Sequence, residues 1–171
     1  MHRQTGQDDE VALHLNNIGR VYHDWGQYTK ATEYYEQALA LNQCSGRQAD
    51  LSVNLNNLAA VYHDWRQYDN ALELYERSLA LERQLGREEE IAKRLNNIGG
   101  VYKAWGDYPQ AITFYEQALQ RYRQLQSESG IAIVLNNIGE IYRLWGKYDH
   151  ALEHYEQGLA LARQLRRAPE I

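Results

Sequence analysis

The sequence predicts an all-α protein, a solenoid of four helix-turn-helix repeats. The first observation behind this prediction is that the 171-residue chain repeats a set of residues every forty positions. A triplet of Leu-Asn-Asn, which begins at Leu15, returns at Leu55, Leu95 and Leu135. The second observation is that each repeat contains two apolar patterns with helical spacing. A fixed period of this length is typical of stacked supersecondary units, each of which buries its apolar face on its neighbour.

The first half of each repeat reads as an amphipathic helix. In the first repeat the apolar residues fall at i, i+4, i+7, i+11 and i+14, along one stripe: Val11, Leu15, Ile18, Tyr22 and Trp25. Acidic residues at 8–10 and 88–90 precede this helix, where they complement the helix dipole. We expect Gly26, Gly106 and Gly146 to end it in the left-handed conformation. Arg66 stands there in the second repeat, which costs about 1 kcal/mol if the conformation is kept.

The second half of each repeat predicts another helix, with an apolar stripe that in the first repeat comprises Ala31, Tyr35, Ala38 and Leu39. A small residue recurs in the middle of the first helix, which indicates that the two helices approach closely there: Gly19, Ala59, Gly99 and Gly139. The chain is therefore expected to be a single array over 1–171 of antiparallel helix pairs. The repeats span approximately 10–49, 50–89, 90–129 and 130–168.

The composition excludes several classes of function. The net charge is −5, which argues against nucleic-acid binding because that function requires a basic surface. No apolar run approaches the roughly 20 residues of a membrane span. The single cysteine, Cys44, can form no internal disulfide, which favours a cytoplasmic location. The sequence contains no glycine-rich phosphate loop and no supported pair of nucleophile and base. We therefore expect no enzyme, no catalytic residue and no cofactor.

Two patterns resemble binding sites but are better explained by the repeat. His150 and His154 match the H-x-x-E-H pattern of certain zinc peptidases, yet both stand at positions that hold other residues in the other repeats. We expect no metal site. The four tryptophans at the ends of the first helices could form an aromatic ladder, but packing between repeats is the expected role of Trp25, Trp65, Trp105 and Trp145.

The repeated pattern resembles the tetratricopeptide repeat (TPR) over nearly the whole chain. The signature residues in the first repeat are Leu15, Ile18-Gly19, Tyr22, Ala31 and Tyr35. The signature recurs in all four repeats, with Leu58-Ala59 in place of Ile-Gly in the second. The period is 40 rather than 34, and the usual closing proline is missing. Such long repeats are similar to those of kinesin light chains, polarity adaptors and bacterial regulatory arrays. The resemblance implies a right-handed solenoid whose first helices line a concave groove for peptide segments.

The asparagine pairs are the strongest candidates for a site in that groove. Adjacent residues on a helix point about 100° apart, so the two members of a pair have different roles. One member can hydrogen-bond between helices and be purely structural. The resemblance places the other member in the groove: Asn17, Asn57, Asn97 and Asn137. A primary amide both donates and accepts, so it can hold the backbone of an extended peptide.

Two further rows of residues are implied to line the groove. One row contains Arg20 and Gly100, and the other is basic or potentially basic: His23, His63, Lys103 and Arg143. The basic row, which Lys93 and Arg94 would extend, indicates an acidic, extended peptide or protein segment as the partner. Asp24 and Asp64 would limit this attraction, and a solvated face remains an alternative. Gly100 follows Gly99, and a pocket for a bulky ligand side chain would explain two adjacent glycines in a helix.

The two ends of the sequence lack the polar caps that solenoids need. Residues 3–6 align with the end of a second helix and Ile171 with the start of a fifth repeat, which indicates a fragment of a longer array or a protein engineered from one. Exposure of Leu152, Tyr155 and Leu159 would favour end-to-end self-association.

The leading hypothesis is a peptide- or protein-binding scaffold. The alternative is a structural spacer or self-assembling module whose asparagines are purely structural.

Overall fold

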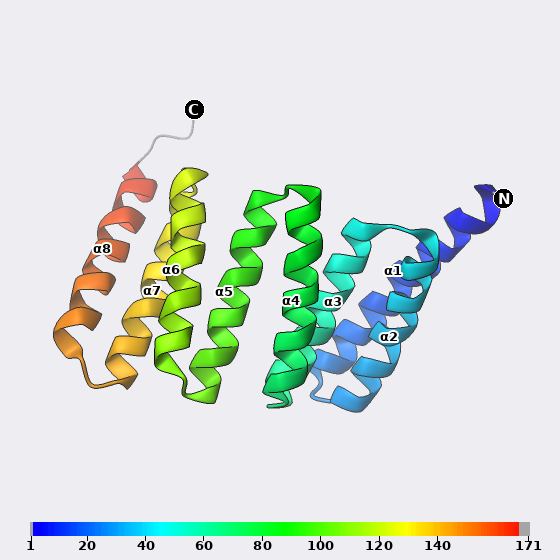
Figure 1. The fold of residues 1–171 in the computed structure, drawn as a ribbon, viewed down its shortest axis with the longest axis horizontal. Helices are drawn as coiled ribbons and strands as arrows, with labels where there is room; N and C mark the ends of the chain where they lie inside the picture. The colour runs from blue at the N-terminus through cyan, green and yellow to red at the C-terminus, as the bar shows by residue number, and fades with distance from the viewer. Residues whose placement is uncertain (1, 168–171) are drawn as a thin grey trace. The chain divides into compact units, whose positions relative to one another are not determined.

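The computed structural model describes the backbone of residues 2–167 and the side chains of residues 8–164. These residues form helices and turns without any strand, so the predicted all-α class is confirmed (Figure 1). The described helices are α1 (His2–Asp24), α2 (Tyr28–Ser45), α3 (Gln48–Asp64), α4 (Tyr68–Leu85), α5 (Glu88–Trp105), α6 (Tyr108–Gln124), α7 (Glu128–Leu144) and α8 (Tyr148–Arg167).

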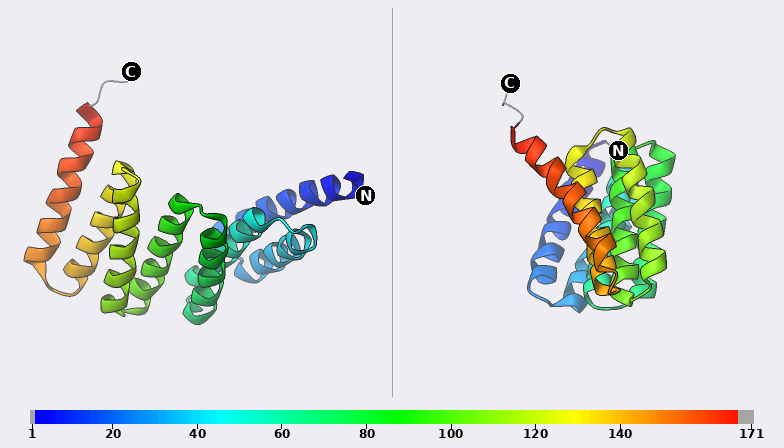
Figure 2. Two further views of the ribbon diagram at one scale, coloured as in Figure 1. Left: turned by 45° about the horizontal axis from the view of Figure 1, so that its top comes forward. Right: turned by 90° about the vertical axis from the view of Figure 1, so that its left-hand side faces the viewer.

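The chain divides into two compact units, Met1–Gly86 and Arg87–Ile171. In the first unit, α1 packs on α2 and α3 packs on α4 as two helix-turn-helix pairs, and α2 joins the pairs by packing on α3. The second unit repeats this arrangement with α5 to α8, where α6 packs on α7. The helices of each pair run antiparallel (Figure 2). Each unit therefore contains two of the predicted repeats.

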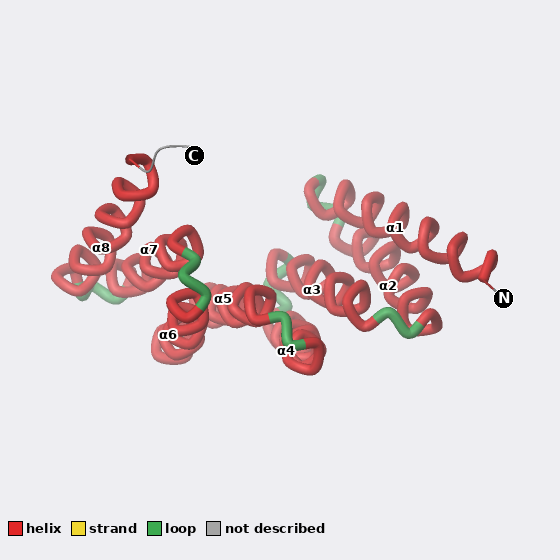
Figure 3. Tube along the Cα trace, turned by 90° about the horizontal axis from the view of Figure 1, so that it is seen from above, coloured by secondary structure: helices red, strands yellow, loops and turns green. Residues whose placement is uncertain are grey.

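The turns between helices are short (Figure 3). They rely on the left-handed backbone conformation. The φ angles of the predicted helix-ending glycines are 75° at Gly26, 88° at Gly106 and 77° at Gly146. Arg66 keeps this conformation with φ of 62°, and Gln126 does the same in another turn with φ of 54°. Because a side chain is disfavoured in this conformation, each of these two turns carries a cost of about 1 kcal/mol.

The first helix begins earlier than the sequence pattern predicts. The acidic residues Asp8 to Glu10 were expected to precede it, and residues 3–6 were expected to belong to an earlier helix. The structure instead places both segments in α1, which is continuous from His2 to Asp24. The motif at Gly6 resembles the one at Gly86, where the chain turns, but it does not interrupt α1. A glycine permits a turn without requiring one.

The predicted close approach of the two helices within a repeat is confirmed. A Cβ atom at Gly99 would lie 2.8 Å from the ring of Tyr115, and one at Gly139 would lie 2.9 Å from the ring of Tyr155. At Gly19 the corresponding distance to Tyr35 is 3.2 Å. Tyr115 is almost completely buried, and burial, with a smaller contribution from Glu140, raises its pKa. A small residue on the first helix thus makes room for a tyrosine from the second.

The apolar stripe predicted for the first repeat is largely exposed. Val11 is 48% exposed, Ile18 is 40% exposed and Trp25 is 69% exposed. In α3, Leu58 occupies the position that corresponds to Ile18 and is only 3% exposed. The physical reason is that α2 covers α3, whereas no described helix precedes α1.

The tryptophans pack between repeats only in part. The rings of Trp65 and Tyr28 lie 6.1 Å apart, as do those of Trp145 and Tyr108, so each of these tryptophans contacts the preceding repeat of its unit. However, all four indoles are exposed, by 37% to 69%. Trp65 and Trp145 therefore have one side of the ring covered by the preceding repeat, while part of each ring stays exposed to solvent.

Candidate functional site

A cleft in the first unit brings together the first two members of the predicted asparagine row. The cleft has a volume of about 610 Å³, and Asn17 of α1 and Asn57 of α3 both line it. Three further asparagines from the three helices α1, α2 and α3 contribute to its wall: Asn16, Asn42 and Asn54. Its size falls within the usual range for ligand sites, about 300–1,000 Å³.

Helical spacing explains why these side chains meet. Asp50, Asn54 and Asn57 occupy i, i+4 and i+7 on α3, which is one face of the helix. Asp9 and Asn16 are likewise seven residues apart on α1. The sequence analysis identified Asn17 and Asn57 but missed Asn54, which is only 1% exposed. The sequence could have indicated Asn54, because it lies three residues before Asn57 and therefore on the same face of the helix.

Charged residues at the rim of the cleft form a small network. Arg47 contacts Oδ2 of Asp9, and its Nη1 lies 3.1 Å from Oδ2 of Asp50. Glu10 also lines the cleft. Two carboxylates contact the arginine and a third lines the same cleft, so the cleft is acidic by formal charge.

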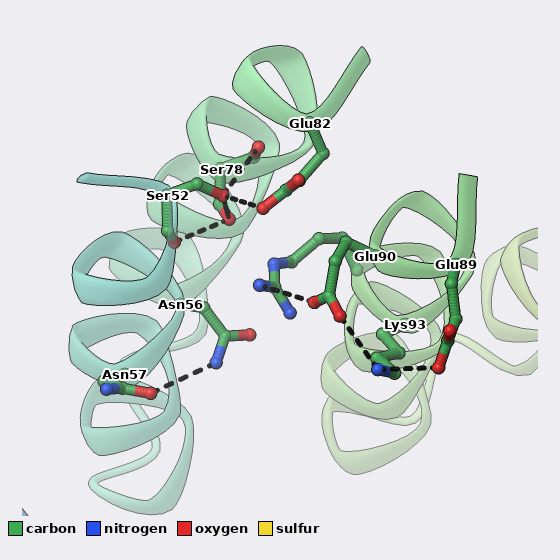
Figure 4. Close-up of polar contacts among 9 residues, drawn as sticks. Ser52, Asn56, Asn57, Ser78, Glu82, Glu89, Glu90 and Lys93 are labelled. Carbon is green, nitrogen blue, oxygen red and sulfur yellow. Dashed lines mark hydrogen bonds and ion pairs between the residues drawn. The ribbon is translucent and has the colours of Figure 1, made fainter. Parts of the chain in front are cut away.

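The asparagines of the second unit show that both members of a pair can take part in hydrogen bonds. Nδ2 of Asn137 donates to Oδ1 of Asn96 at 2.9 Å, which links α7 to α5. In the first unit, Nδ2 of Asn56 donates to Oδ1 of Asn57 at 3.3 Å (Figure 4). Asn17 is exposed, whereas Asn57, Asn97 and Asn137 are half-buried. The bond between Asn96 and Asn137 joins two helices, which is what the purely structural interpretation of the asparagines requires.

Carboxylates accompany the basic row. Nε2 of His23 lies 2.8 Å from Oδ2 of Asp64, and Nδ1 of His63 lies 3.5 Å from the other oxygen of this carboxylate. In the second unit, Nζ of Lys103 lies 2.7 Å from Oε2 of Glu140. Arg20 and Arg143 are exposed. Asp64 and Glu140 thus offset much of the positive charge on which an acidic ligand would depend.

Lys93 and Arg94 do not extend the basic row as expected. Nζ of Lys93 lies 2.9 Å from Glu89 and 2.8 Å from Glu90 (Figure 4). Arg94 is 5% exposed and its guanidinium lies 3.2 Å from Glu90. Burial opposes ionisation of Glu90, but the hydrogen bond from Lys93 and the nearby arginines outweigh it and lower the pKa of Glu90. The register of α5 therefore directs both cations to acidic residues of their own helix.

Gly100 is not required by the packing that surrounds it. A Cβ atom there would lie 3.7 Å from the hydroxyl of Tyr115, which is an ordinary van der Waals contact. This situation differs from that of the adjacent Gly99, whose Cβ would overlap the same tyrosine ring. A ligand pocket near Gly100 stays a prediction.

The zinc-like pattern has a local structural role. Nδ1 of His154 lies 2.8 Å from the backbone oxygen of His150, and both imidazoles pack near the ring of Tyr142. Among the described residues, no three His, Cys, Asp or Glu side chains are grouped so that they could hold a metal ion. Nor does any described helix combine the length and the apolar character needed to cross a membrane.

Paired antiparallel helices at a fixed period define a class of helical-repeat proteins whose usual role is that of a non-catalytic scaffold for protein interactions. Models of the tetratricopeptide repeat match residues 12–43, 50–124 and 90–164. The chain therefore belongs to the tetratricopeptide repeat family. No curated protein matches the chain in sequence.

Solved structures share this fold at low sequence identity. BtubC (BKLC) from P. vanneervenii has a TM-score of 0.82 and 22% identity over 96% of this chain and 68% of its own. Aspartyl phosphate phosphatase F from Bacillus subtilis has a TM-score of 0.84 and 19% identity over 93% of this chain. A Rap protein complexed with Competence and Sporulation Factor has a TM-score of 0.81 and 24% identity over 92% of it. The chain spans only 42% and 44% of the last two proteins.

Proposed function

We propose that the chain is a non-enzymatic, cytoplasmic scaffold that binds an extended peptide or protein segment through the asparagine row. The cleft that contains both Asn17 and Asn57 is the observation that carries this proposal. Amides in such a cleft can donate to carbonyl groups and accept from N–H groups of a peptide backbone. The Rap protein complexed with Competence and Sporulation Factor is a precedent for a similar fold in a complex.

Acidic side chains of the ligand would fit the second unit better than the first. Arg143 is exposed there, and an incoming carboxylate would compete with Glu140 for Lys103. In the first unit, Asp64 already lies beside His23 and close to His63. The preference for acidic ligands is therefore proposed only for residues near Lys103 and Arg143.

The test is a screen of nine- to twelve-residue peptides against the wild-type chain and a variant with alanine at Asn17, Asn57, Asn97 and Asn137. We expect ligands that bind the wild type to lose at least tenfold in affinity in the variant. A matched control is Asn136→Ala, which removes an exposed asparagine beside Asn137.

Thermal melts separate this result from the structural alternative. Asn17→Ala should leave the stability unchanged because Asn17 is exposed. Asn137→Ala should cost about 0.5–1.5 kcal/mol through loss of its bond to Asn96. If no peptide binds either protein, and the fourfold variant loses much of its stability, the asparagines are purely structural and the binding proposal is wrong.

We also propose head-to-tail self-association, which two exposed apolar faces favour. On α1, Ile18 is 40% exposed and Val21 is 61% exposed, although Val61, which corresponds to Val21, is fully buried under α2. On α8, Leu159 is 49% exposed, whereas its counterpart Leu119 in α6 is 7% exposed. The exposed positions are those that bury surface between repeats within a unit, so α8 of one copy could cover α1 of the next.

Sedimentation velocity tests this association. We expect oligomers of the wild type at high micromolar concentration and a monomer for Val21→Glu. The control is Ile133→Glu, which makes the same kind of change at a side chain that is 57% exposed on α7. A wild-type protein that stays monomeric at this concentration would contradict the proposal. Because the two faces differ, the contact is heterologous, and it produces rings where the rotation between copies closes and filaments where it does not.

A further inference from the structure

Three buried polar atoms in the cleft of the first unit have no hydrogen-bond partner in the protein. They are Oδ1 of Asp9, Oδ1 of Asn16 and Nδ2 of Asn54. All three residues line the same cleft. Buried polar atoms in native proteins are nearly always paired with protein, ligand or ordered water, so these three atoms require partners from outside the chain.

In Asn16 and Asp9, the other polar atom of the same side chain already has a partner within the protein. Nδ2 of Asn16 donates to the backbone oxygen of Ala12 at 3.0 Å, which leaves its Oδ1 unpaired. Arg47 contacts Oδ2 of Asp9, which leaves the other carboxylate oxygen unpaired. Asn54 is only 1% exposed, so bulk water does not hydrate its amide freely.

The unpaired atoms indicate which ligand groups would pair with them. Asp9 and Asn16 offer acceptors, while Asn54 offers a donor. The carboxylates of Asp9, Glu10 and Asp50 outnumber the single cation of Arg47, so the cleft favours a positively charged group. Apolar walls from Ala12, Leu13 and Val53 suit the methylene groups of a long side chain.

We propose that this cleft binds a lysine or arginine side chain of a peptide, whose ammonium or guanidinium donates to Asp9 and Asn16. A backbone carbonyl of the same peptide accepts from Nδ2 of Asn54 once the side chains that cover this amide have shifted. This inference rests on the proposed function as a peptide-binding scaffold, and it assigns a basic residue to the part of the ligand that meets the first unit. It differs from the acidic ligand that the basic row indicated.

The probes are three capped pentapeptides, Ac-Gly-Gly-X-Gly-Gly-NH2, in which X is arginine, norleucine or glutamate. Binding is measured by calorimetry and by shifts of the side-chain amide signals of Asn16 and Asn54 in NMR spectra. We expect the arginine peptide to shift both signals and to bind at least tenfold more tightly than the other two. A tighter or equal affinity for the glutamate peptide would overturn the inference.

Asp9→Asn is the decisive variant, and Asp8→Asn is its matched control. Both remove one negative charge from adjacent positions of α1, but Asp8 is exposed and does not line the cleft. We expect Asp9→Asn to weaken the arginine peptide at least fivefold and Asp8→Asn to change it less than twofold. Equal effects would show attraction by net charge alone and would overturn the site.

The outcome separates this inference from the proposed function. If the peptide screen yields ligands that depend on Asn57 but the arginine peptide does not bind at millimolar concentration, the scaffold proposal stands and this inference is wrong. If the arginine peptide binds with the expected dependence on Asp9 while no longer peptide binds, the cleft is a site for a basic group and the extended asparagine row fails as a clamp.

Discussion

Ser52→Ala should lower the free energy of unfolding by about 1.5–3 kcal/mol, the range for a hydrogen bond to a charged group. The Ser52 hydroxyl donates to Oε1 of Glu82 at 2.5 Å, and its oxygen lies 2.8 Å from Oγ of Ser78 (Figure 4). All three side chains are completely buried between α3 and α4. Without this donor the Glu82 carboxylate loses a short bond that water cannot replace. Urea unfolding monitored by circular dichroism measures the change.

The chain itself supplies a control for the size of the substitution. Alanine stands at the equivalent positions 12, 92 and 132, so its shape fits this place in a repeat. Ser78→Ala, which leaves the bond from Ser52 to Glu82 in place, should cost less. The double variant should lose less than the two single losses added together, because the two hydroxyls belong to one network. A loss below about 0.5 kcal/mol for Ser52→Ala would show that the network contributes little.

Gly130→Ala should destabilise the second unit by about 1–3 kcal/mol, although alanine is the better helix former. A Cβ atom at 130 would overlap three ring carbons of Tyr122. That ring is 7% exposed and cannot move into solvent without exposing its apolar surface. The overlap therefore forces a shift of α6 against α7. Thermal and urea unfolding of the variant measure the effect.

Gly100→Ala is the matched substitution with the opposite expected sign. Its Cβ has only an ordinary contact at 3.7 Å, so the higher helix propensity of alanine should stabilise the chain by up to about 1 kcal/mol. Tyr122→Asn should relieve the strain of Gly130→Ala in a double variant, because Asn42 and Asp50 occupy the equivalent positions in the first unit. If both glycine variants stabilise the protein, the contact with Tyr122 does not constrain position 130.

Local sequence signals predicted the repeats and their turns correctly. The forty-residue period and the helical spacing of apolar residues identified the helix pairs because both depend on residues within one repeat. At Arg66 the sequence set only the cost of a left-handed turn if that conformation was kept, and the structure shows that it is kept. The small residues at 19, 99 and 139 indicated a close helix contact, and tyrosines fill that space.

The incorrect expectations concern partners that are not local. The start of α1, the exposure of Val11 and Trp25, and the burial of Arg94 depend on which helix covers a given face. A repeated pattern assigns the same environment to equivalent residues, but α1 and α3 have different neighbours. Ile18 is therefore exposed, although its counterpart Leu58 is buried.

The sequence by itself determined that this protein is a tetratricopeptide array with paired asparagines in each first helix, because periodicity and helix propensity are properties of neighbouring residues. Only the tertiary structure decided which polar atoms meet. Asp9, Asn16 and Asn54 come from helices that lie about one repeat apart, and their unpaired atoms share a cleft because α1, α2 and α3 pack together. Hydrogen-bond pairing depends on distances of a few tenths of an ångström, and packing sets those distances.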